Sequence, residues 1–383
     1  MALSGIRVID LTRILAGPFC TLMLADMGAE VIKVEPPKGD PVRGQGAIKH
    51  GLSWYFSQFN RNKKSIVLDL YTEEGKADLT LLLKSADVLV ENYRPGVLAK
   101  MGFTSEFLEE INPRLICTSV NGYGSTGPYV DRPSFDFIAQ AMSGFMSVNG
   151  AADEDPMRAA PPISDMIAGL YAAFGVVTAL HARQRTGKGQ NVESSLTNGL
   201  ISMMAYLSAE YLATGEIPKR TGNNHPIASP YGLFRASDGR VAVAPSNDVF
   251  VKRFLDVLDL GGLLEEERFK TNADRMENRD ELLDIINAVT EKNTVEHWIT
   301  VINEAGCPCG RTMDLSEVFS DPQVLSQEML LEVDHPGRGT VKMTGFPVKF
   351  SKTPAKIHRA TPELGEHTEE ILSPLREGRI VSE

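Results

Sequence analysis

The first 125 residues alternate between short strand-like runs and amphipathic helical segments. The strand-like runs are residues 6–11, 29–35, 65–70, 87–91 and 114–120. Helical patterns separate several of them, and Gly28 follows the first helical pattern as an expected C-terminal stop. A strand–helix–strand order requires parallel strands joined by right-handed crossovers. We therefore predict an α/β fold with a doubly wound parallel sheet in this region.

After residue 125 the sequence pattern changes, first to long helical segments and then to a hairpin followed by more helices. Residues 164–185 are nearly all helix formers, and residues 196–214 form a second helical pattern that is apolar around much of its circumference. Such a helix is buried or is covered by another subunit. Residues 231–244 read as a hairpin that turns at Asp238–Gly239. Helical patterns follow, so we predict a smaller α+β domain over residues 225–320.

The overall charge argues against several classes of partner. The chain has 50 Asp and Glu against 39 Lys and Arg, a net charge of −11, and no basic block. Nucleic acid would be repelled by such a chain. No uninterrupted apolar run reaches the roughly 18 residues of a membrane span, and the N-terminus lacks the apolar core of a secretory signal. We therefore expect neither nucleic-acid nor membrane partners.

The cysteines and histidines indicate a reduced, metal-free protein. There are four cysteines, and Cys307 and Cys309 lack the spacing of a redox or zinc motif. None of the seven histidines sits at metal-ligand spacing from another. We expect free thiols, a cytoplasmic location and no bound metal.

One glycine-rich segment matches a dinucleotide fingerprint in spacing only. Residues 122–127, Gly-Tyr-Gly-Ser-Thr-Gly, follow a predicted strand. The fingerprint requires a helix to begin there, with its N-terminus facing a pyrophosphate. Pro128 and Pro133 follow instead. We therefore do not predict a nicotinamide site.

Two cationic segments are candidates for a phosphate pocket. Residues 60–65, Asn-Arg-Asn-Lys-Lys-Ser, precede a predicted strand, and residues 92–96, Asn-Tyr-Arg-Pro-Gly, follow another. Lys100 lies one turn into the next helix. Ligands of open α/β sheets bind at the carboxyl ends of strands, where arginine forks hold phosphate. Solvated loops remain the alternative interpretation.

Asp165 stands where a proline-rich loop becomes the long apolar helix. One interpretation is that Ser164 or Asp165 simply caps that helix. The other is a carboxylate that the helix dipole keeps ionised and that acts as a nucleophile in covalent catalysis. The local pattern fits both interpretations.

Taken together and in order, the motifs resemble those of the class III CoA-transferase family, which includes formyl-CoA transferase and carnitine CoA-transferase. The resemblance runs nearly from end to end. The segments that carry it are residues 10–18, 25–35, 60–65, 91–96, 122–128, 131–133, 185–190, 335–337 and 364–368.

The resemblance implies a catalytic residue and a binding site for coenzyme A as a substrate, with no permanently bound cofactor. Asp165 stands at the family's catalytic aspartate. The implied CoA-binding residues are Leu15, Ala16, Asn60, Arg61, Asn62, Lys63, Asn92, Tyr93, Arg94, Lys100, Arg132, Pro133, Ser134 and Phe135. One departure is Pro36, where several relatives carry an arginine that stacks on adenine; Lys38 or Arg43 could take its place.

The reaction implied is transfer of CoA from an acyl-CoA to a carboxylic or dicarboxylic acid. It proceeds through an aspartyl anhydride and an aspartyl-CoA thioester. The run at residues 60–65 and the general character of the sequence look closest to family members that use succinyl-CoA and dicarboxylic acids. The alternative is an α-methylacyl-CoA racemase, which shares the fold. Racemases place a histidine where this chain has Phe135, before Asp136.

The resemblance also implies the architecture. Residues 1–190 would form a Rossmann-like large domain, 191–224 a helical linker and 225–320 the smaller α+β domain. The loop-rich tail, 321–383, would return to the large domain. Two subunits would interlock as a homodimer.

Overall fold

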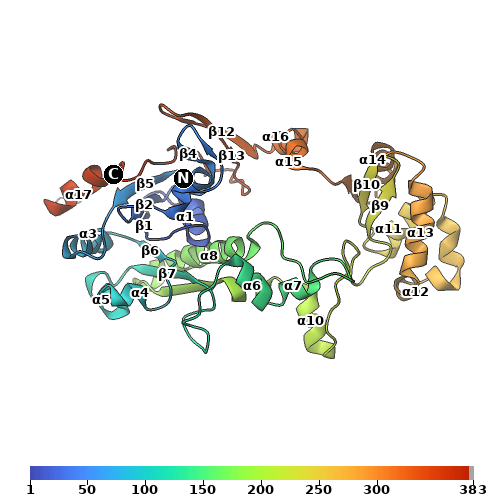
Figure 1. The fold of residues 1–383 in the computed structure, drawn as a ribbon, viewed down its shortest axis with the longest axis horizontal. Coiled ribbons are helices and arrows are strands. Elements are labelled where there is room, and N and C mark those ends of the chain that lie inside the picture. The colour runs from blue at the N-terminus through green and yellow to red at the C-terminus, as the bar shows by residue number, and fades with distance from the viewer. Residues whose placement is uncertain (379–383) are drawn as a thin grey trace. The chain divides into compact units, whose positions relative to one another are not determined.

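The computed structural model describes residues 1–378, which divide into two compact units (Figure 1). The larger unit contains residues 1–145, 158–209 and the described residues from 322 onward. The smaller unit contains residues 146–157 and 210–321. The chain thus leaves the larger unit twice, after residues 145 and 209, and returns to it at residues 158 and 322.

A six-stranded sheet forms the centre of the larger unit, in the order β5-β2-β1-β6-β7-β8. Every neighbouring pair in it is parallel. The strands are β1 (Arg7–Asp10), β2 (Glu30–Glu35), β5 (Lys63–Val67), β6 (Val88–Glu91), β7 (Ile116–Asn121) and β8 (Asn191–Ser195). The parallel α/β sheet predicted from the strand–helix alternation is confirmed.

Strand β8 differs from the sequence prediction, which placed residues 191–195 in a helical linker. Its residues pair in parallel with Cys117–Asn121 of β7 at the edge of the sheet. The segment Asn-Val-Glu-Ser-Ser has a single apolar side chain. An edge strand of that composition carries too little hydrophobic periodicity to be recognised from sequence.

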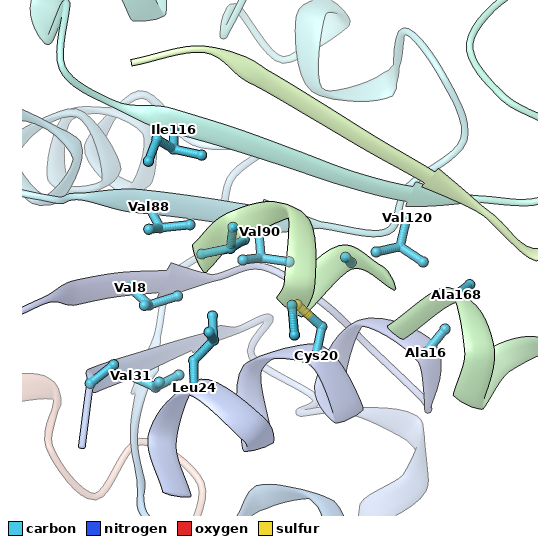
Figure 2. Close-up of a cluster of buried hydrophobic side chains, with 14 of the residues drawn as sticks. Val8, Ala16, Cys20, Leu24, Val31, Val88, Val90, Ile116, Val120 and Ala168 are labelled. Atoms are coloured by element: carbon cyan, nitrogen blue, oxygen red, sulfur yellow. The ribbon is translucent and has the colours of Figure 1, made fainter. Parts of the chain in front are cut away.

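Helices cover both faces of this sheet. On one face, α1 (Ala16–Asp26) and α8 (Ile163–Thr186) pack on valines and isoleucines of the strands. Figure 2 shows Val8, Val88 and Ile116 of the sheet facing Leu24 and Cys20 of α1. On the other face, α3 (Glu73–Lys84), α5 (Ser105–Ile111) and α17 (Thr368–Arg376) enclose a second apolar cluster. The sheet therefore lies between two hydrophobic layers.

Helix α8 is long and apolar enough, by length and composition alone, to cross a membrane, with a mean hydropathy of 1.7 over a stretch of 18 residues. Half of that stretch is buried inside the protein. Ala168, Ala172 and Val176 of this helix are among the buried residues of the core. Packing on the sheet therefore accounts for the apolar composition of this face of α8.

The segment predicted as one helix over residues 196–214 is two helices. They are α9 (Leu196–Ser202) and α10 (Ala205–Thr214). The chain turns at residues 203–204, and Ala205, where α10 begins, has a positive φ of 49°, which a continuous α-helix does not allow. The apolar pattern continues across the break, so periodicity alone did not reveal it.

The larger unit also contains short elements and an antiparallel hairpin in the tail. These are η1 (Pro41–Gly44), β3 (Ile48–Lys49), β4 (Leu52–Ser53), α2 (Trp54–Asn60), α4 (Val97–Lys100), α6 (Asp136–Met142), α16 (Pro322–Ser326), β12 (Leu330–His335) and β13 (Gly339–Thr344). The hairpin β12–β13 was not predicted in a tail expected to be loop-rich. Helix α7 (Phe145–Val148) begins at the last residue before the smaller unit.

The smaller unit contains a three-stranded sheet in the order β11-β10-β9 and several helices. The strands are β9 (Gly232–Ala236), β10 (Gly239–Val243) and β11 (Cys309–Arg311). The helical elements are α11 (Asp248–Val257), η2 (Gly261–Glu265), η3 (Glu267–Phe269), α12 (Asn272–Glu277), α13 (Arg279–Thr290), α14 (Val295–Glu304) and α15 (Leu315–Val318). The hairpin predicted to turn at Asp238–Gly239 is confirmed by the pairing of β9 with β10.

Helices α1 and α8 approach each other very closely at Gly169. A β-carbon placed on Gly169 would lie 2.5 Å from the carbonyl oxygen of Ala16 and 3.0 Å from the ring of Phe19. Real β-carbons are not found so close to backbone, so only glycine fits here. This contact holds the beginning of α1 against the first turns of α8.

We expect Gly169→Ala to destabilise the protein, because the added methyl group must push α1 and α8 apart. Overpacking of this kind costs about 1–3 kcal/mol, partly offset by the better helix propensity of alanine. Urea denaturation would measure the loss. The matched control is Gly44→Ala, where an added β-carbon meets nothing within 4 Å. An equal stability for both variants would contradict the close contact.

Candidate active site

A cavity of the larger unit opens at the carboxyl ends of its strands. Residues 13–16 follow β1, residues 92–97 follow β6 and residues 120–124 end β7; all three segments line it. Its volume is about 450 Å³, within the range of small-molecule sites. Parallel α/β sheets bind ligands at this edge. The cavity is therefore the candidate active site.

Ten of the predicted site residues line this cavity. They are Leu15, Ala16, Asn92, Tyr93, Arg94, Arg132, Pro133, Ser134, Phe135 and Asp165. They come from four places in the sequence that the sheet topology brings together. Asp165 is the one carboxyl group among the described residues that line the cavity.

The cationic segment Asn60–Lys63, predicted as a phosphate clamp, does not line this cavity. The four residues are between 0% and 3% exposed. The Arg61 guanidinium pairs with Asp26 at 2.7 Å. The Lys63 ammonium pairs with Asp10 at 3.1 Å and donates to Thr21 at 2.7 Å. Their charges are therefore neutralised inside the protein.

Lys100, also predicted for the site, lies at the exposed end of α4 and is not among the residues that line the cavity. Arg43, considered as a substitute for the missing arginine at Pro36, forms a fork with both carboxylate oxygens of Glu35 at 2.7 and 2.8 Å. Neither residue supplies charge to the cavity in this conformation.

Arg13 was missed by the sequence analysis. It lines the cavity, and its guanidinium lies 5.3 Å from the ring centre of Tyr93. Its backbone is also tied to Asn92, which accepts from the Arg13 N–H at 2.9 Å and donates to its carbonyl at 2.8 Å. Because Arg13 follows the end of β1, the strand-end rule used for Arg94 could have identified it.

Three arginines, Arg13, Arg94 and Arg132, therefore line the cavity. Arg132 lies over the ring of Tyr129, with its guanidinium carbon 3.7 Å from the ring centre. Guanidinium groups bind phosphate through paired N–H donors and stack on planar rings. The cavity of this acidic protein is thus locally cationic.

Asp165 lies in the first turn of α8, beside the buried carboxylate of Asp136. Asp136 begins α6, and its Oδ1 accepts from the backbone N–H of Ser164 at 2.9 Å and from its hydroxyl at 2.8 Å. Its Oδ2 accepts from Gln140 at 2.7 Å. These bonds fasten the start of α6 to the start of α8, and they place a negative charge close to Asp165.

The pKa of Asp165 is raised to about 7, first by burial and then by the charge of Asp136. Burial and Asp136 thus oppose the ionisation that the helix N-terminus is expected to favour. Removal from water disfavours the charged form of a carboxyl group. Raised carboxyl pKa values of this size are typical of functional sites.

Tyr55 of α2 is a second residue that the sequence analysis missed. Burial, followed by the negative charges of Asp165 and Asp40, raises its pKa to about 12. Its phenol is therefore protonated at neutral pH and within electrostatic reach of Asp165. No local sequence signal marks it, because a tyrosine in a short helix is ordinary.

The lining of the cavity does not favour the racemase alternative. Phe135 precedes Asp136 at the start of α6, lines the cavity and is 67% exposed. A phenyl ring neither gives nor takes a proton, and racemisation needs an acid and a base on opposite faces of a carbon.

Among residues 1–378, no group of three or more His, Cys, Asp or Glu could hold a metal ion.

Comparison with known proteins agrees with this geometry. The sequence model of CoA-transferase family III matches residues 3–368. The chain is 38% identical to succinate–glutarate CoA-transferase of Agrobacterium fabrum, over 97% of this chain and 95% of that one. It is 41% identical to acetyl-CoA:oxalate CoA-transferase of Acetobacter aceti, over 91% and 89% of the two chains.

A solved structure supports the same assignment. The crystal structure of a CaiB/BaiF family protein from Brucella suis superposes with a TM-score of 0.86 and 37% identity, covering 97% of this chain and 99% of that chain. The fold, the whole-length family match and the named relatives agree. The chain therefore belongs to CoA-transferase family III and is a class III CoA-transferase.

Proposed function

We propose that this enzyme moves CoA from succinyl-CoA to a dicarboxylic acid, with Asp165 as the covalent nucleophile. The observation that carries the proposal is the position of Asp165, as the sole carboxyl group among the described residues lining a cavity with three arginines. The two relatives described above are named for reactions with dicarboxylic acids, glutarate and oxalate.

The proposed reaction begins with attack of the Asp165 carboxylate on the thioester carbonyl of the donor. The C–S bond breaks, giving an acyl–aspartyl anhydride and CoA thiolate. The thiolate then attacks the aspartyl carbonyl, releasing the donor acid and leaving an aspartyl-CoA thioester. The acceptor carboxylate reverses these two steps and leaves as the new acyl-CoA. Each step exchanges one activated acyl bond for another, so no ATP is consumed.

Each attack creates an oxyanion that needs hydrogen-bond donors. Helix α1 begins at Ala16 beside the cavity, and no side chain caps its first N–H groups. We assign these N–H groups as candidate donors. Helix N-termini carry partial positive charge, which suits an oxyanion.

The CoA phosphates are proposed to bind the cavity arginines, Arg13, Arg94 and Arg132. Asn92 and Tyr93 hold Arg13 in place through the hydrogen bonds and ring contact described above. Leu15, Ala16 and residues 133–135 would contact the uncharged parts of CoA. This set replaces the buried segment Asn60–Lys63 in the binding site proposed from the sequence.

A homodimer is also proposed, supported by an uncovered apolar face on α8 and α9. Leu170, Phe174 and Val177 of α8 and Ile201 of α9 are between 45% and 69% exposed. Exposed apolar surface of this kind is typical of subunit interfaces.

We propose a cytoplasmic location as well, since Cys20, Cys117, Cys307 and Cys309 are free thiols.

We expect Asp165→Ala and Asp165→Asn to lose CoA transfer by at least roughly a thousandfold, because the nucleophile is gone. The assay mixes the protein with succinyl-CoA or acetyl-CoA and a pool of dicarboxylic acids, and identifies new acyl-CoA species by mass spectrometry. The matched control is Asp153→Ala, an exposed carboxyl outside the cavity. Transfer by the Asp165 variants at the wild-type rate would show that another group is the nucleophile.

We expect kcat/KM to fall as the pH drops below about 7, because the attacking form of Asp165 is the carboxylate and its pKa is raised to about 7. Asp136→Asn removes a charge that raises this pKa, so the acidic limb of the pH profile should shift to lower pH. Asp153→Asn should leave the profile in place. A limb that does not move in Asp136→Asn would contradict the electrostatic coupling.

We expect Phe174→Asp to convert the dimer to monomers, because it places a charge in the proposed apolar interface. Sedimentation equilibrium would measure the mass. Tyr71→Asp is the control, since Tyr71 is an aromatic residue 85% exposed outside this face. A wild-type protein that sediments as a monomer would refute the proposed dimer.

A further inference from the structure

The loop between β1 and α1 has an unusual backbone at the cavity wall. Ile14 has a φ of 70°, in the left-handed region. A β-branched residue there is strained by about 1–3 kcal/mol. Residues 13–16 line the cavity. Such a conformation persists only where the surrounding structure holds it.

Two buried side chains hold this loop from behind. The carboxylate of Asp40 accepts from the Ile14 N–H, with both oxygens at 3.3 Å. The Lys33 ammonium donates to the carbonyl of Thr12 at 2.8 Å and pairs with Asp40 at 3.0 Å. The side chains of Lys33 and Asp40 are 0% and 1% exposed. Neither residue lines the cavity.

A second buried pair supports the same loop. Asp10 Oδ1 accepts from the N–H and the hydroxyl of Thr12 at 2.9 and 2.5 Å, and Asp10 Oδ2 pairs with Lys63 at 3.1 Å. Burial lowers the pKa of Lys33, but Asp40, Asp10 and Glu35 raise it more, so its pKa lies above the usual value. Lys33 is therefore charged.

Stability alone does not explain the Lys33–Asp40 pair. Replacing a buried ion pair by apolar side chains of similar size is often neutral or stabilising, because both charges lose their hydration. What apolar side chains could not supply is the pair of polar contacts to the backbone of Thr12 and Ile14. Those contacts reach the strained part of the cavity wall.

We propose that Lys33 and Asp40 are positioning residues of the acyl-CoA site, whose buried ion pair holds Ile14 in its left-handed conformation so that Arg13, Leu15 and Ala16 form the cavity wall. The pair acts through the loop and does not touch the reacting atoms. The role assigned to the loop rests on the proposed binding of CoA in this cavity.

The test is the double variant Lys33→Met with Asp40→Leu, which removes both charges together and leaves no unpaired charge from this pair. Hydrogen exchange followed by mass spectrometry should show faster exchange in the peptide covering residues 12–16, with the β12–β13 hairpin unchanged. The Kd for CoA, measured by calorimetry, should rise roughly tenfold, which corresponds to about 1.4 kcal/mol. The matched control is Lys64→Met with Glu30→Leu, which removes an ion pair between β5 and the first residue of β2 that does not line the cavity.

Each result decides the proposal. Unchanged exchange in residues 12–16, or an unchanged Kd for CoA, would overturn it, as would an equal effect of the control pair. If the double variant does not fold, Asp40→Asn takes its place with the same readouts. Loss of folding there too would make the pair structural and overturn the proposal. One further outcome separates the two proposals. If the wild-type protein binds no CoA, but residues 12–16 still exchange faster in the double variant, the proposed function is refuted and the positioning of the loop by Lys33 and Asp40 stands.

Discussion

The contact between α1 and α8 at Gly169 determines where the parts of the site meet. Because Gly169 has no side chain, the carbonyl of Ala16 lies against α8 one turn beyond Asp165. The two helix starts therefore face the same cavity at the carboxyl edge of the sheet. One carries the carboxyl group and the other carries uncapped N–H groups. A side chain at residue 169 would separate the two halves of the site.

Charge is distributed unevenly around this contact. Lys33, Lys63 and Arg61 are buried and paired with aspartates, whereas Arg13 and Arg94 remain available in the cavity. Asp165 is partly buried, and its raised pKa follows from that burial and from Asp136. The same burial that disfavours the carboxylate also limits access of water, which would hydrolyse an anhydride. Burial of Asp165 therefore bears on both its pKa and the lifetime of the proposed anhydride.

The residues predicted for the site differ in whether they line the cavity. Asp165 lies at the start of a helix, and Arg94 lies just after the end of a strand. Both kinds of position can be recognised from the neighbouring residues in the sequence. Lys63 and Arg61 were assigned to phosphate because the sequence shows their charge but not their partners. Those partners, Asp10 and Asp26, are distant in the chain and are brought near by the sheet. Tyr55 could not be found, because only its electrostatic proximity to Asp165 distinguishes it.

The sequence by itself determined the parallel α/β sheet of the larger unit, the β9–β10 hairpin of the smaller unit and the family, because periodicity, turn residues and ordered motifs are properties of neighbouring residues. Only the tertiary structure decided which cations reach the cavity, the raised pKa of Asp165, the break at Ala205 and the addition of β8 to the sheet. Burial, ion pairing and strand pairing arise between segments far apart in the chain. Their energies depend on solvent exclusion and distance, which no local pattern contains.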